Sequence, residues 1–218
     1  MFHEVDWPAV WQATGETAYM VGISTFFTAL FGIPLGVLLV VTERGNLWDL
    51  PWLQKIVSGF VNIFRAVPFI VLVLFLFPLA EFLVGTSLGP TAATIPLIAG
   101  AAPFYARMVE TALREVDKGV VEAARSVGTT RLQVVRYVLI PEATPALVSG
   151  LTVTCVTLIS FSAMAGVVGG GGLGDAAFRY GFQSFNDGML YVCGILLILM
   201  VQLVQWCGDW ISRRLDKR

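Results

Sequence analysis

The sequence has 218 residues, of which 56% are hydrophobic and only 13% are charged, and its formal net charge is −1 at pH 7. A soluble globule of this length cannot hide so much apolar surface from water. The composition therefore excludes a soluble protein and indicates that lipid surrounds much of the chain, and we expect no nucleic-acid partner.

Long uncharged runs mark the membrane-spanning helices, because a helix needs about 18 or more apolar residues to cross a bilayer. The run from Thr17 to Val41 carries no charge, and the next run carries only Arg65 near its start. The turn signal GTSLGP at 85–90 precedes a third run. We predict an all-α polytopic membrane domain over residues 1–218, with transmembrane helices at about 17–41, 56–80, 91–111, 146–168 and 188–208.

The basic residues fall on one side of this predicted topology. With five spans the termini lie on opposite sides, and thirteen of the 14 Lys and Arg residues then share one face, with Arg179 as the exception. Since short loops rich in Lys and Arg stay in the cytoplasm, we predict the N-terminus outside and the C-terminus in the cytoplasm. Residues 1–16 contain no Lys or Arg, which argues against a cleaved signal peptide.

The longest predicted cytoplasmic segment, 114–145, has the pattern of two short amphipathic helices. Asp117 is a suitable cap for the first helix, and Gly128 ends it. Apolar residues recur on one stripe of this helix, at Val116, Val120, Ala123 and Val127.

The second helix of this segment has its own start and stop signals. Thr130 and Gln133 form a T-x-x-Q capping box, and we expect Pro141 and Pro145 to end the element before the fourth span. Its apolar stripe consists of Leu132, Val135 and Val138. Two interpretations stay open: the pair of helices docks a partner, or it lies flat on its own bundle or on lipid headgroups.

The glycines after the fourth span have the spacing of a nucleotide-binding motif. Gly169, Gly171 and Gly174 form G-x-G-x-x-G, which has this meaning only after a strand. Here the motif follows a predicted membrane helix, so we interpret it as a flexible loop or re-entrant turn. The sequence also lacks the Gly-Lys pair of a P-loop, so any nucleotide chemistry belongs to another chain.

No pattern in the sequence indicates catalysis or a metal site. The only histidine is His3, and Ser160 and Ser162 lack both a G-x-S-x-G context and an interior histidine as base. The cysteines have no C-x-x-C spacing and lie in or at the edge of predicted spans, at Cys155, Cys193 and Cys207. We expect a subunit that is not an enzyme and has no cofactor of its own.

The sequence EAA at 122–124, with Gly128 six residues after the Glu and V-x-I-P at 138–141, resembles the EAA signature of bacterial ABC importer permeases. Val138 and Ile140 stand where that family commonly has Ile and Leu. Three further segments resemble the methionine-uptake branch: NIFRAVPFI at 62–70, GAAPFYARMVE at 100–110 and SAMAGVVGGGGLG at 162–174.

This resemblance implies the permease subunit of a type I ABC importer in the bacterial cytoplasmic (inner) membrane. It implies a homodimer, two cytoplasmic ATPase subunits that bind ATP and Mg²⁺, an external substrate-binding protein, and methionine in its L or D form as substrate. Transport then proceeds by alternating access driven by the ATPase. By the same resemblance the residues of the ATPase-coupling helix are Glu122, Ala123, Ala124, Gly128 and Pro141.

Two further regions receive expected roles, each with a simpler alternative. Ser160, Ser162 and Met164 are candidates for the translocation pathway, although serines in membrane helices also bond to their own helix carbonyls. The glycine motif falls on the predicted outer face, where it serves either as a flexible contact and gate or as a plain connector. For the whole chain, the alternatives are an ion-coupled carrier or a permease for another small amino acid or organic solute.

Overall fold

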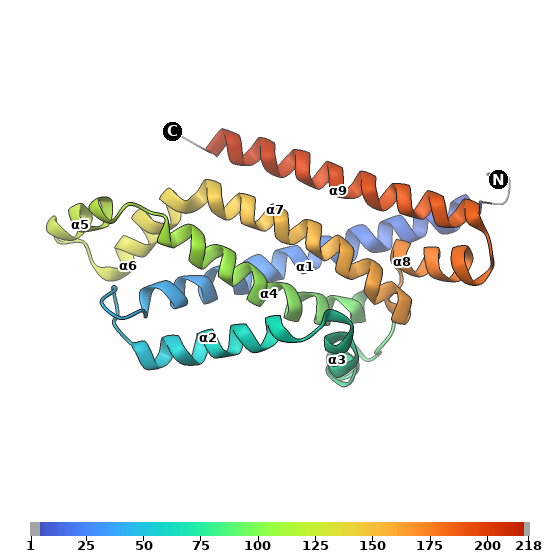
Figure 1. Cartoon of the computed structure of the whole chain (residues 1–218), viewed down its shortest axis with the longest axis horizontal. Coiled ribbons are helices and arrows are strands. Elements are labelled where there is room, and N and C mark those ends of the chain that lie inside the picture. The colour runs from blue at the N-terminus through green and yellow to red at the C-terminus, as the bar shows by residue number, and fades with distance from the viewer. Residues whose placement is uncertain (1–4, 216–218) are drawn as a thin grey trace.

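Every regular element of residues 5–215, which the computed structural model describes, is a helix (Figure 1). Residues 1–4 and 216–218, which include His3 and Lys217, lie outside the described residues. Within the described range, four helices are long and apolar enough to cross a membrane, and the bent pair α2 and α3 forms a further candidate span. This architecture is the all-α membrane fold that the composition predicts.

Helix α1 (Trp7–Val41) begins before the expected start at residue 17. The Asp6 carboxylate accepts a hydrogen bond from the Ala9 N–H at 3.2 Å, and Pro8 occupies the first turn. Both are favourable at a helix N-terminus, where backbone N–H groups lack partners. The cap thus sets the start of the helix, and α1 is longer than its uncharged run.

The second expected span is not one helix. Helix α2 (Pro51–Ala66) ends before helix α3 (Phe69–Val84) begins, and the two are bent by 108° relative to each other. Pro68 explains the break, because it has no N–H to continue α2 and disfavours helical geometry in Val67, whose ψ is 125°. The prediction of a single helix over 56–80 is therefore wrong.

Three helices pack closely in the centre of the bundle, through a small residue in one contact and through a buried tyrosine in the other. A Cβ added to Gly36 of α1 would lie 2.5 Å from the Cβ of Val109 in α4 (Pro90–Arg114). On the same helix, Tyr105 is 1% exposed and donates its hydroxyl to the Leu147 carbonyl in α7 (Ile140–Ala165) at 3.1 Å. Close helix contact through small residues is typical of membrane bundles.

Helix α9 (Asp187–Leu215) packs along α7 and leaves an apolar face outside the bundle. Gly208 faces α7 so closely that a Cβ would overlap the Thr152 side chain, and the Ser149 and Ser212 hydroxyls are 2.8 Å apart. Trp206, by contrast, is 72% exposed. An outward face of this kind suits lipid or a second copy of the chain.

The short helices gather at opposite ends of the long ones (Figure 1). Helices α5 (Lys118–Ser126) and α6 (Arg131–Val134) lie at the end where α1 finishes and α2 begins, which we call the α5 end. Helix α8 (Gly172–Ala176) lies at the other end, beside the start of α1, which we call the α8 end.

Candidate functional site

The segment between α4 and α7 folds as its local signals predict. The Asp117 carboxylate accepts a hydrogen bond from the Gly119 N–H at 2.6 Å and so caps α5. Gly128 ends the helix with φ of +84°, a conformation in which a side chain is strained. The capping box of α6 is present, with the Gln133 Oε1 accepting from the Thr130 N–H at 2.8 Å.

Three of the four residues in the predicted apolar stripe, Val120, Ala123 and Val127, are exposed, whereas the fourth, Val116, is buried. Val121 and Ala124 pack against the apolar cluster at the α5 end, and Val116 is buried before the helix begins. The remaining residues of the predicted stripe are not covered by the bundle: Val120 in α5 is 45% exposed, and Val127, directly after α5, is 80% exposed. Packing on its own bundle thus accounts for one face of α5 and leaves a second apolar face uncovered.

The coupling residues expected from the EAA signature share this exposed surface only in part. Glu122, Ala123 and Gly128 are exposed, whereas Ala124 is half-buried toward the bundle. Pro141 is exposed in the first turn of α7.

Neither Pro141 nor Pro145 ends the element, contrary to the expectation, and Pro145 lies inside α7. The chain runs helically from α6 through the π-helical turn η1 (Val135–Leu139) into α7. The wider turn of a π-helix changes the hydrogen-bond spacing just before the proline, which removes the conflict between the proline ring and a regular α-helix. Helix α6 is therefore continuous with the next membrane helix, α7.

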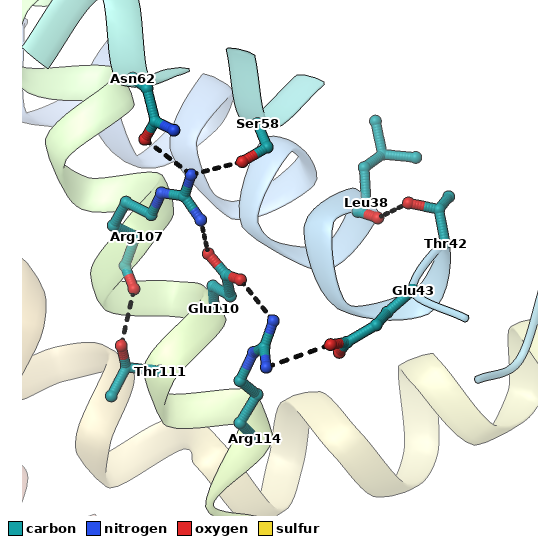
Figure 2. A network of polar contacts seen from close by, with 9 residues as sticks. All are labelled: Leu38, Thr42, Glu43, Ser58, Asn62, Arg107, Glu110, Thr111 and Arg114. Atoms are coloured by element: carbon teal, nitrogen blue, oxygen red, sulfur yellow. Dashed lines mark hydrogen bonds and ion pairs between the residues drawn. The ribbon is translucent and has the colours of Figure 1, made fainter. Parts of the chain in front are cut away.

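Arg107 of α4 joins this helix to α2 (Figure 2). Its Nη2 donates to the Ser58 Oγ at 2.7 Å and to the Asn62 Oδ1 at 2.8 Å. Ser58 and Asn62 are four residues apart, so they lie on one face of α2. The guanidinium group presents several donors in a fixed plane and can hold both acceptors at once.

Glu110 extends this contact toward the end of α4 and toward α1 (Figure 2). Its two carboxylate oxygens pair with Arg107 at 2.5 Å and with Arg114 at 2.8 Å, and Arg114 reaches Glu43 at 3.3 Å. The Glu110 side chain is only 8% exposed. We call this set the Arg107 network, and its members are Glu43, Ser58, Asn62, Arg107, Glu110 and Arg114.

Sequence reasoning did not find the Arg107 network. The spacing of Arg107, Glu110 and Arg114 at i, i+3 and i+7 places all three on one side of a helix and was an available signal. The partners on α2 could not be read from this spacing, because Ser58 and Asn62 are far away in the sequence. Asn62 and Arg107 do lie in two of the segments that resemble methionine permeases, and the structure joins those segments.

The three expected pathway residues do not meet at one place. Ser162 is buried and donates its hydroxyl to the Ile159 carbonyl of its own helix at 2.7 Å. Ser160 and Met164 are exposed and lie four residues apart, on one side of α7. Ser162 therefore bonds to its own helix, as the simpler alternative to a pathway role expects, while Ser160 and Met164 form an exposed pair.

The glycine segment is a packed turn and not a flexible loop. Gly169 and Gly171 adopt φ of +92° and +77° in and just after the π-helical turn η2 (Gly166–Gly170), and Gly174 is buried in α8. The Gly172 N–H donates to the Glu16 Oε2 of α1, and the Leu173 N–H donates to the Thr17 Oγ1, each at 2.8 Å. The glycines thus let the backbone fold tightly against α1.

A family model described as "Binding-protein-dependent transport system inner membrane component" matches residues 32–217. The chain belongs to this family. This permease is therefore a multi-pass protein of the inner membrane and a non-catalytic component of a transport system. Within residues 5–215, no cluster of His, Cys, Asp or Glu side chains has the arrangement of a metal site.

The permease is similar over nearly its full length to proteins named for methionine transport. It is 50% identical to the "Probable D-methionine transport system permease protein MetI" of Vibrio cholerae, over 94% of this chain and 92% of that protein. It is 47% identical to the "Methionine import system permease protein MetP" of Bacillus subtilis, over 100% and 98% of the two chains.

Solved structures share the fold. A chain of the MetNI methionine ABC transporter in an inward-facing conformation superposes with a TM-score of 0.95 and 44% identity, over 98% of this permease and 100% of that chain. An amino acid ABC transporter solved with histidines has a TM-score of 0.78 at 19% identity, over 95% and 94% of the two chains. The latter similarity supports the fold alone.

Proposed function

We propose that this permease is the membrane subunit of an ATP-driven methionine importer. The proposed assembly contains two copies of the permease, two cytoplasmic ATPase subunits and an external substrate-binding protein. Similarity to permeases named for methionine supports the substrate, and similarity to a chain of MetNI supports the assembly. The observation that carries the coupling role is the apolar stripe on α5 that the bundle leaves uncovered.

The α5 end is the cytoplasmic side in this proposal. Arg114, Arg125 and Arg136 lie in helices at this end and Arg44 lies in the turn between α1 and α2, whereas Arg179 follows α8 at the other end. Because Lys and Arg in short loops stay in the cytoplasm, this distribution supports an external N-terminus and a cytoplasmic C-terminus. Helix α8 and the glycine segment then face outward, where they offer the binding protein a packed surface.

Docking at α5 gives an ATPase a means of moving the bundle. Only residues 115–117 separate α4 from α5, and α6 continues through η1 into α7. Closure of two ATPase subunits around ATP would draw two such segments together and convert the dimer from inward-facing to outward-facing. A shift of this equilibrium from 1:99 to 99:1 needs about 5.5 kcal/mol of differential binding.

The solute path lies between two copies in this proposal. Ser160 and Met164 present one polar and one flexible apolar group on an exposed side of α7, which suits a neutral amino acid with a thioether side chain. The exposed face needs a second copy to enclose a path.

Uptake in cells tests the substrate and the energy source together. The permease is expressed with its ATPase and binding protein in cells without their own methionine uptake, and the entry of labelled L-methionine is measured. We expect excess unlabelled L- or D-methionine to compete and other neutral amino acids to compete far less.

The matched control carries an ATPase whose P-loop lysine is replaced by alanine, which should abolish uptake. Uptake that persists with this ATPase would contradict the proposal and favour an ion-coupled carrier. Competition by another amino acid at equal strength would reject methionine as the specific substrate.

A further inference from the structure

Helix α2 is held to the bundle by few contacts. Val61 is its one fully buried residue, and it packs with Leu39 of α1 and Ala106 of α4. Large apolar residues such as Ile56 and Ile63 are exposed on its outer side. This small apolar contact permits α2 to slide against α1 and α4, because apolar contacts have no directional requirement.

Arg107 provides the directional contact that α2 otherwise lacks. Among residues 5–215, the only side-chain hydrogen bonds that join α2 to another element are those from Arg107 to Ser58 and Asn62. Two bonds from one planar guanidinium group fix both the distance and the register of α2 against α4.

The other end of the Arg107 network reaches the coupling segment. Arg114 is the last residue of α4, and the cap of α5, Asp117, follows three residues later. The charges alternate in sign along Glu43, Arg114, Glu110 and Arg107, so the group carries no net formal charge. Glu110 is held firmly, because a buried carboxylate that loses its cationic partners pays a large desolvation cost.

We propose that the Arg107 network transmits movement of the coupling segment to α2, and through the bend at Pro68 to α3. Arg107 is a positioning residue for transport in this role. The inference rests on the proposed function, since it requires an ATPase that moves α5. When the end of α4 moves, Glu110 and Arg107 move with it, and the hydrogen bonds to Ser58 and Asn62 carry α2 along.

The double variant Ser58→Ala with Asn62→Ala tests this inference without uncovering a buried charge, because Arg107 keeps its pair with Glu110. In the assembled transporter, we expect normal recovery of the ATPase and near-normal ATP hydrolysis. Uptake should fall about fivefold or more, the lower limit of ordinary coupling between sites. The ratio of ATP hydrolysed to solute imported therefore rises.

The matched control is Gln54→Ala, which truncates a polar side chain on α2 that has no hydrogen bond to another described residue. It should leave the ratio of hydrolysis to uptake unchanged. Arg107→Lys is a second test variant, because lysine keeps a positive charge beside Glu110 but lacks the planar fork. It should raise the same ratio.

Two results would overturn the inference. Unchanged uptake in both test variants would show that these hydrogen bonds carry no movement. A parallel loss of hydrolysis and uptake, with a lower melting temperature, would show a merely structural role. Failure of the proposed function is recognised separately, because the wild-type complex would then show no ATP-dependent uptake at all.

Discussion

Gly128 has room for a side chain but not the backbone conformation for one. A Cβ placed there meets no heavy atom within 4 Å, while φ is +84°. Substitution at this site thus acts on the turn between α5 and α6 and not on packing. This separation makes Gly128 a suitable residue for testing the coupling segment without disturbing the membrane bundle.

We predict that Gly128→Val strains the turn by about 1–3 kcal/mol, because a β-branched residue is unfavourable at positive φ. The amount of permease in the membrane should stay normal, while ATPase recovery in a detergent pull-down and solute uptake both fall. Gly128→Asn is the control, since asparagine enters the left-handed region more readily. Full ATPase recovery with full uptake in the valine variant would show that this turn is not the docking site.

At the scale of elements, the turn from η2 into α8 has no space for added atoms. A Cβ on Gly174 would lie 2.3 Å from the Ala163 carbonyl oxygen, and a Cβ on Gly166 would lie 2.4 Å from the Asp175 nitrogen. These neighbours are backbone atoms, which cannot move aside as a flexible side chain does. The element therefore depends on glycine for close approach as well as for positive φ.

We predict that Gly174→Ala lowers the stability of the permease by about 1–3 kcal/mol, the usual cost of overpacking. The melting temperature of the purified protein in detergent measures this effect. Gly194→Ala in α9 is the control, because its Cβ meets nothing within 4 Å and alanine favours helix. Equal melting temperatures for the two variants would disprove the tight packing of α8.

At the scale of the whole molecule, the two ends of the bundle should lie on opposite sides of the membrane. We predict that a reporter active only in the cytoplasm works when fused after Arg218 or within residues 46–52. The same reporter should be inactive when fused within 85–89 or 183–186. The positive-inside rule is the physical reason, and reporter activity in cells is the measurement. The reverse pattern of activity would invert the orientation.

The sequence predicted those parts of the permease that depend on local signals. The cap at Asp117, the capping box at Thr130 and the glycine that ends α5 each depend on residues a few positions apart, and the structure contains all three. Apolar runs likewise indicated a membrane fold. The EAA signature indicated the family, which the match over residues 32–217 confirms.

The missed features depend on contacts between distant segments. The Glu16 carboxylate caps the start of α8 from α1, and Asn62 meets Arg107 across two helices. No periodicity within either segment predicts such a pair. The break at Pro68 is different, because the proline was visible, but the apolar run was interpreted as one span. The apolar composition of a segment indicates that lipid or protein surrounds it, but it does not indicate whether the segment forms one continuous helix.

The break between α2 and α3 also has a consequence for hydration. A helix end leaves about four carbonyl groups without intrahelical partners, and hydrocarbon offers them none. Among residues 5–215, no hydrogen bond from another element reaches the carbonyls in the last turn of α2. We therefore expect this bend to lie where water, lipid headgroups or another protein chain can supply hydrogen-bond donors, and not in a dry bilayer interior.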